Sequence, residues 1–124
     1  NNHVYIRPHT NVKNSFVTKL SAPKKSGYML KTTLKNGESI NVGGYVIKRE
    51  NDKITTDRSE VFNIKGNYRL IAETPVINDG YELEIYVDEH LVEVFINNGE
   101  YVISNVVYGL TEEITGKNYD LYSA

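Results

Sequence analysis

Three acidic residues occupy positions at which a carboxyl group could do chemistry: Asp57, Asp88 and Glu93. A pair of carboxyl groups can hydrolyse a glycosidic bond, one as acid and the other as nucleophile or base. Asp57 and Asp88 fall where we expect a hairpin to reverse, and aspartate is a common turn residue. Glu93 alternates with apolar neighbours, which is typical of a charge on the solvent face of a strand. These patterns favour structural roles for all three.

The histidines and glycines give no sign of another active site. His3, His9 and His90 are scattered, whereas a metal site needs clustered ligands with compatible spacing. The chain has no cysteine, which excludes a thiolate nucleophile, a disulfide and a cysteine-ligated metal. Gly43-Gly44 is not followed by Lys-Ser/Thr, so it does not indicate a phosphate-binding loop. We therefore expect no catalytic residue, no cofactor site and no metal site.

Tyrosine is the one residue type that could bind a sugar here. The chain has ten tyrosines and no tryptophan, and a tyrosine ring can stack on a sugar while its hydroxyl finds a hydrogen-bond partner. Tyr86, Tyr101 and Tyr108 lie in segments that look like strands, where tyrosine is also favoured for packing alone. Sugar binding and cross-strand packing both stay open.

Composition limits the class of protein. The 124 residues are 40% hydrophobic and 24% charged with a net charge of -2, which predicts one globular domain over residues 1–124. This balance gives no basic surface for nucleic acid, and no apolar run is long enough to cross a membrane. Because the chain opens without Met, we expect that it was cut from a longer protein. The cellular compartment stays open.

The elements that must position these residues are strands. In residues 81–87, Tyr81, Leu83, Ile85 and Val87 share one face. In residues 91–96, Val92, Val94 and Ile96 oppose Leu91, Glu93 and Phe95. Asn97-Asn98-Gly99 then favours a tight hairpin, because Asn and Gly tolerate the positive φ of a type I′ turn. Residues 81–108 are therefore predicted to form a three-stranded meander.

Further short strands are predicted on either side of turn signals. They are residues 5–6, 15–20, 27–34, 39–42, 45–49, 54–56 and 67–72. Residues 111–113 fit either one helical turn or a loop, and no longer helix pattern occurs. Turn signals every 8–12 residues between short strands are typical of a β-sandwich.

Two segments carry a resemblance to a known family. Residues 81–108, YELEIYVDEHLVEVFINNGEYVISNVVY, and residues 45–60, YVIKRENDKITTDRSE, resemble the C-terminal β-sandwich of glycoside hydrolase family 32. That family contains invertases, levanases and sucrose-6-phosphate hydrolases. The matching features are Val87-Asp88, Val92-Glu93-Val94-Phe95 with the Asn-Gly turn, and Asp57-Arg58-Ser59. Glu89-His90 departs from the serine-rich turn usual in the family.

The resemblance implies an all-β, two-sheet antiparallel β-sandwich of the lectin-like jelly-roll type. It also implies that the chemistry belongs to a separate N-terminal five-bladed propeller, whose Asn-Asp-Pro-Asn, Arg-Asp-Pro and Glu-Cys motifs are missing from this chain. We therefore expect a non-catalytic module of a β-fructosidase that acts on sucrose, sucrose 6-phosphate or fructans, with the propeller as its partner. The alternative is an autonomous carbohydrate-binding module. An apolar patch flanking one edge would favour the first, and an exposed aromatic row on one sheet the second.

Overall fold

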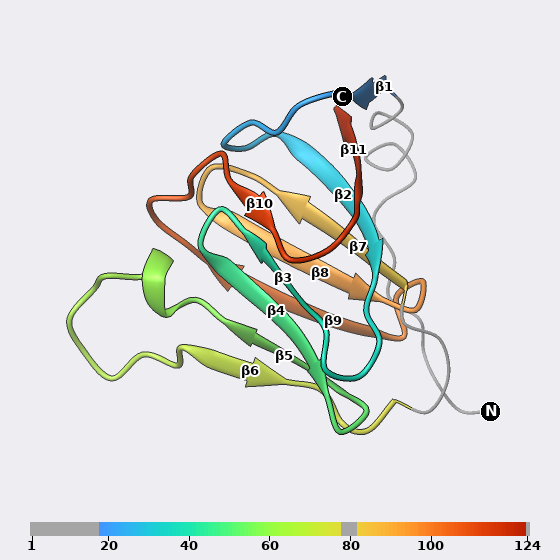
Figure 1. Cartoon of the computed structure of the whole chain (residues 1–124). Coiled ribbons are helices and arrows are strands. Elements are labelled where there is room, and N and C mark those ends of the chain that lie inside the picture. The colour runs from blue at the N-terminus through green and yellow to red at the C-terminus, as the bar shows by residue number, and fades with distance from the viewer. Residues whose placement is uncertain (1–17, 78–81, 124) are drawn as a thin grey trace.

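The computed structural model describes residues 18–77 and 82–123, and within them eleven strands form two antiparallel sheets (Figure 1). One sheet has the order β1 (Thr18–Leu20), β11 (Asp120–Ser123), β2 (Tyr28–Thr33), β7 (Glu82–Val87), β8 (Leu91–Ile96) and β9 (Tyr101–Val106). The other has the order β10 (Ile114–Thr115), β3 (Ser39–Val42), β4 (Tyr45–Glu50), β5 (Lys53–Asp57) and β6 (Ile71–Glu73).

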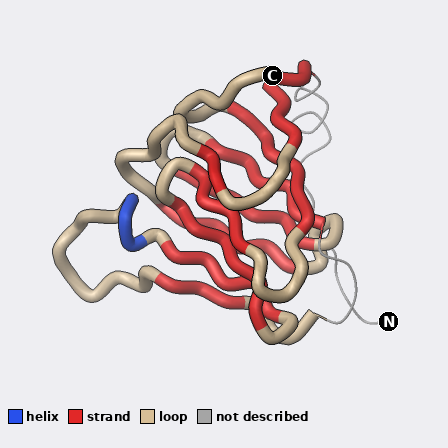
Figure 2. The backbone as a smooth tube through the Cα atoms, viewed as in Figure 1, coloured by secondary structure: helices blue, strands red, loops and turns tan. Residues whose placement is uncertain are grey.

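The five-stranded sheet lies over the six-stranded sheet, and the chain passes between them several times. In the described part of the chain the one helical element is a single 3-10 turn, η1 (Ser59–Val61) (Figure 2). The expected two-sheet antiparallel β-sandwich is confirmed. No helix in the described residues is long and apolar enough to cross a bilayer.

The core fills the space between the sheets, because alternate residues of each strand point inward. On β2, Tyr28 and Leu30 are at most 1% exposed, and on β7 and β8 Ile85 and Val94 are completely buried. Burial of one such side chain stabilises the fold by about 1.5–3 kcal/mol. The alternation predicted for residues 81–87 and 91–96 is therefore confirmed as the pattern that directs one set of side chains into the core.

One polar contact joins the two sheets inside this core. The Tyr45 hydroxyl on β4 donates a hydrogen bond to Asn105 Oδ1 on β9 at 2.6 Å. Thr56, fully buried on β5, also directs its hydroxyl to this oxygen at 3.4 Å. Burial raises the pKa of Tyr45 to about 12, so the phenol stays protonated and acts as the donor. Such a contact favours one register of the two sheets over others.

A second, smaller apolar cluster lies on the outer face of the six-stranded sheet. Met29, Tyr86 and Phe95 are 2–8% exposed, and Val102 and Tyr122 pack against them. The Tyr86 and Phe95 rings meet edge to face at 5.5 Å. The alternation correctly placed these side chains opposite the core, but did not indicate that they are buried.

The β8–β9 hairpin lies where the sequence predicted it, but its loop is longer than a two-residue turn, because Ile96 pairs with Tyr101 and leaves residues 97–100 between the strands. Asn97 and Asn98 have φ of 51° and 60°, and the amide of Gly99 donates to the carbonyl of Ile96 at 3.1 Å. Positive φ at both central residues is typical of a type I′ turn, which is therefore centred on Asn97 and Asn98. Gly99 follows with φ 94° and leads the chain into β9.

Some expected elements differ from the structure. Of residues 67–72, only the last two are strand, because Arg58 rather than a neighbouring strand binds the carbonyls of Arg69 and Leu70. Residues 111–113 form a loop, and the short strands β10 and β11 were not expected. The expected strand at residues 5–6, residues 15–17 of another and Tyr81 lie outside the described residues.

A buried arginine fixes the β4–β5 turn. Arg49 is 3% exposed; it donates to the Leu34 carbonyl at 3.1 Å and to Asp52 Oδ1 at 2.8 Å. Asn36 donates to the same carboxylate oxygen at 2.9 Å. Hydrogen bonds from Asn36 and Arg49 lower the pKa of Asp52 below its usual value. The carboxylate therefore contributes most to stability when it is ionised.

Gly99→Val should destabilise the domain by about 1–3 kcal/mol, because a β-branched residue at positive φ is strained. Asn98→Gly is the matched control, since glycine adopts the existing positive φ without strain. Thermal melts of the two variants and the parent chain test this. An unchanged midpoint for Gly99→Val would contradict the turn geometry.

Asp52→Asn should weaken the domain near neutral pH while preserving the turn, since asparagine also tolerates the φ of 59° at this position. The folded-state pKa of Asp52 lies below the unfolded one, so its contribution is complete above the unfolded pKa and is lost as pH falls through the folded one. The stability gap between the parent chain and the variant should therefore shrink on acidification. Urea unfolding at several pH values measures this gap; a gap that stays constant would contradict the ion pair's role.

Candidate functional site

The Asp57-Arg58-Ser59 element lies where β5 leaves its sheet and η1 begins. Asp57 Oδ1 accepts a hydrogen bond from the Ser59 amide at 2.8 Å and another from the Ser59 hydroxyl. A side-chain oxygen that bonds backbone two residues on is the typical aspartate turn. Asp57 therefore shapes the chain reversal that presents Arg58.

Arg58 joins β9, an edge strand of one sheet, to the segment that leads into β6, an edge strand of the other. Its Nη1 donates to the Val106 carbonyl on β9 at 2.8 Å, and Nε and Nη2 donate to the Arg69 carbonyl at 2.9 and 2.6 Å. The guanidinium carbon lies 3.8 Å from the centre of the Phe62 ring. β6 and β9 are the last strands of their sheets on this side. Arg58 therefore closes the sandwich at an edge that the strands leave open.

A chain of aromatic rings covers this closed edge. Phe62 contacts Tyr68 at 5.1 Å and Tyr108 at 5.8 Å between ring centres, and Tyr108 contacts His90 at 5.3 Å. Leu91 and Val106 are paired across β8 and β9 beside them. We call this surface the edge face, made of Phe62, Tyr68, His90, Leu91, Val106 and Tyr108.

The edge face carries several exposed apolar side chains close to one another. Tyr68 is 52% exposed, Val106 43%, Tyr108 42% and Leu91 36%. Ile64, Leu70 and Ile71 add further exposed apolar side chains from the same segment after η1. A contiguous apolar patch of this kind marks an interaction surface more often than a free one. Exposed apolar side chains of this kind therefore gather at one edge of the sandwich, which agrees with the patch expected of a packing module.

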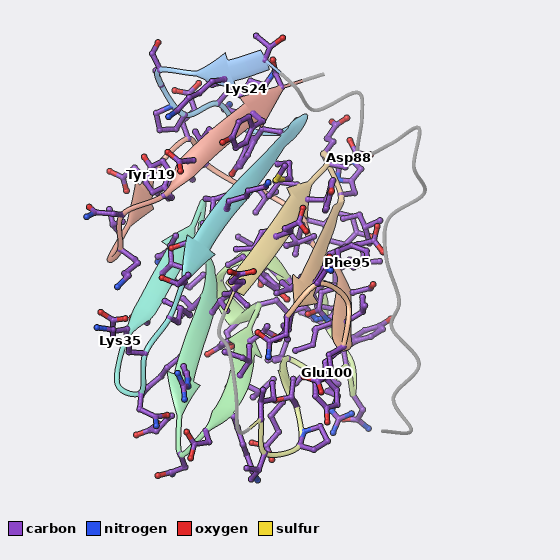
Figure 3. The ribbon with its side chains drawn as sticks, turned by 90° about the vertical axis from the view of Figure 1, so that its right-hand side faces the viewer. Lys24, Lys35, Asp88, Phe95, Glu100 and Tyr119 are labelled. Atoms are coloured by element: carbon purple, nitrogen blue, oxygen red, sulfur yellow. The ribbon has the colours of Figure 1, made fainter. Side chains whose placement is uncertain are left out.

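Each of the three acidic candidates accepts hydrogen bonds in a different part of the fold. Asp88 lies in the β7–β8 turn, where its Oδ1 accepts from the Glu89 amide at 2.8 Å, and Figure 3 shows it at the far end of β8 from Glu100. Glu93 Oε2 accepts from the Ser104 hydroxyl across β8 and β9 at 3.1 Å. Asp57 holds its turn. The structure uses these carboxylates in the turn and strand roles that their sequence positions favoured.

His90, the one histidine among the described residues, belongs to no cluster of three potential metal ligands. His90 stacks on Tyr108, and its Nε2 lies 3.8 Å from a carboxylate oxygen of Glu89. Across residues 18–77 and 82–123, no three His, Cys, Asp or Glu side chains come together as a metal site would require. His3 and His9 lie outside the described residues.

The tyrosines singled out by sequence have different surroundings. Tyr86 is buried, and burial together with nearby Glu84 raises its pKa to about 12. Tyr101 is half-buried and packs against the core, whereas Tyr108 is exposed on the edge face. Tyr68, the most exposed of these rings, was missed because residues 67–72 were expected to be a strand. The rings of Phe62 and Tyr68 meet at 69° and those of Phe62 and Tyr108 at 37°, so they form no flat sugar platform.

A groove of about 640 Å³ lies beside β2, β7 and residues 117–120. Figure 3 shows Tyr119, from this groove, on the side away from Phe95. Lys117 Nζ is bound to both carboxylate oxygens of Glu38 at 2.8 Å. Lys31 lies 5.6 Å from the centre of the Tyr122 ring. Both lysines of the groove are thus engaged with neighbouring side chains of the domain itself.

The chain forms two antiparallel sheets around one core. An arginine closes one edge, and the candidate carboxylates make structural contacts. This arrangement defines a β-sandwich module. Residues 9–122 match the family model described as glycosyl hydrolases family 32 C terminal. The chain belongs to this family of C-terminal domains.

A solved structure of a longer protein contains the same fold. A sucrose-6-phosphate hydrolase from Lactobacillus gasseri is 24% identical, with a TM-score of 0.75, and the match covers 96% of this chain but only 30% of that one. The shared fold is therefore a minor part of that protein. A search of the curated proteins found no match.

Arg58→Ala should destabilise the domain by about 1–3 kcal/mol, because three charge-assisted hydrogen bonds and the stacking on Phe62 are lost together. Arg58→Lys should recover little, since one ammonium cannot reproduce a planar fork that binds carbonyls of two separate segments. Arg69→Ala is the control: its side chain is exposed, and the substitution keeps the carbonyl that Arg58 binds. Urea unfolding compares the three, and equal losses for Arg58→Ala and Arg69→Ala would contradict the bridging role.

Proposed function

We propose that this chain is a non-catalytic module of a larger family 32 β-fructosidase, which hydrolyses sucrose, sucrose 6-phosphate or fructans. Its role is to pack against the catalytic five-bladed propeller of the same polypeptide and to stabilise it. A single observation carries this proposal: the side chains of Asp57 and Arg58 are both occupied in structural contacts. The element of the sequence richest in reactive groups builds a turn and joins β9 to the segment that precedes β6.

Several features agree with this role. Retaining glycoside hydrolysis needs two carboxyl groups about 5–5.5 Å apart, one with a raised pKa. Asp57, Asp88 and Glu93 instead make contacts in three separate elements. The partial coverage of the Lactobacillus gasseri protein supports a parent with at least one further domain. The inclined rings of the edge face argue against the alternative of an autonomous carbohydrate-binding module.

The isolated 124-residue chain should release no fructose from sucrose, sucrose 6-phosphate or levan above a buffer blank. Without a positioned nucleophile and acid, neither the covalent step nor protonation of the leaving group is available. The parent lacking this domain should lose thermal stability while retaining its catalytic groups. Circular dichroism of the isolated chain checks that an inactive sample is folded.

Reproducible turnover by the isolated chain would contradict the proposal if it disappears in Asp57→Asn, Asp88→Asn or Glu93→Gln. A truncated parent as stable as the full-length enzyme would also contradict it.

A further inference from the structure

The edge face has the composition of an interface centre. Its exposed side chains are aromatic or aliphatic, and interface centres are enriched in Tyr, Phe and Arg and depleted in other charges. Arg58 lies beneath it, and its charge is engaged by two carbonyls and by the Phe62 ring. Charged residues of both signs, Glu60, Lys65, Arg69 and Glu89, are exposed along the adjoining segments. This arrangement is an apolar centre with a charged rim.

The edge face is also held in place before any partner arrives. The amide of Tyr108 donates to the carbonyl of Val61 at 2.6 Å, and that of Val107 donates to the carbonyl of His90 at 3.0 Å. These bonds fix the segment after β9 against both η1 and the β7–β8 turn. A surface whose backbone is already fixed pays little ordering entropy on binding.

We propose that the edge face is the surface on which another domain of the same polypeptide docks; this rests on the proposed function. The partner presents an apolar surface to the aromatic centre, with side chains of both signs at its margin. In the similar Lactobacillus gasseri protein, 70% of the chain lies outside the matched region, since the match covers 30% of it. A partner of this kind is tethered, so its effective concentration reaches the millimolar range without high intrinsic affinity.

The extent of the patch favours a tethered domain over a second copy. Five of the six edge-face side chains are exposed, since Phe62 is buried, and together they present on the order of a few hundred Å², comparable to the largest patch on a typical monomer. A stable association between separate molecules buries about 800 Å² on each partner. The edge face is thus too small for a stable dimer on its own but sufficient as the centre of a contact between linked domains.

Hydroxyl-radical footprinting of the full-length parent tests whether the edge face is covered. Tyr68 and Tyr108 should react several-fold more slowly than their half-exposed state in this domain predicts. Tyr119 and Tyr122, which lie on β11 or next to it, should react at the rate that their own exposure predicts. Tyr68 and Tyr108 reacting as open tyrosines in the parent would overturn the proposal.

Two valines of similar exposure provide a matched pair of variants in the same parent. Val106 is 43% exposed at the edge face, and Val76 is 50% exposed next to Ile77, which binds the β4–β5 turn. Val106→Asp should lower the melting transition of the parent or split it in two and restore the reactivity of Tyr68 and Tyr108. Val76→Asp should do neither. Tyr108→Ser, in a loop position, repeats the test if aspartate on β9 disturbs the strand.

Failure of this inference is distinguishable from failure of the proposed function. If truncation of the domain destabilises the parent but Val106→Asp and Val76→Asp behave alike, the domain docks through another face. Protection of Tyr108 in the isolated chain that rises with protein concentration would show a second copy as the occupant. Protection only after addition of levan oligosaccharides would show a sugar site. Either result overturns the proposal.

Discussion

The fold depends on the mutual coverage of two apolar sheet faces. Each strand has one apolar side, and sheets that pack about 10 Å apart remove these sides from water only if both keep their register. A slip of one residue would turn Leu30 or Ile85 outward. The buried hydrogen bonds of Tyr45 and Thr56 to Asn105 also fix how the sheets lie on each other, because only one relative placement of the two sheets allows them. The other features of the domain are attached to this core.

The same physics explains which parts of the fold could be predicted from sequence. Strands β7 and β8 alternate over six residues each, so their existence, inward faces and connecting turn followed from periodicity. β10 and β11 have two and four residues, too few for a period to be visible. They form because β3 and β2 offer unpaired edges nearby in space. Such strands are defined by long-range partners, which a local pattern does not contain.

The candidate site shows the same division between local and distant causes. The turn role of Asp57 is local, since its partner Ser59 is two residues away, and the sequence pattern favoured it. The role of Arg58 is distant, because its acceptors are carbonyls 11 and 48 residues away. Backbone carbonyls leave no mark in a sequence, so no spacing rule could pair Arg58 with Val106. Tyr68 was missed for a related reason: the segment that carries it bends around that arginine instead of continuing as a strand.

A β-sandwich always has strands at its edges, and an open edge invites pairing with another chain. Here Arg58 binds carbonyls at the edge formed by β6 and β9, and the aromatic rings then pack over the guanidinium. As a result, backbone carbonyls at this edge are bound by Arg58, and apolar side chains face the solvent in their place. Backbone edges pair with almost any strand, whereas a shaped apolar surface accepts only a complementary one. A domain that docks on one neighbour in its own polypeptide, as we propose for this one, gains from that exchange.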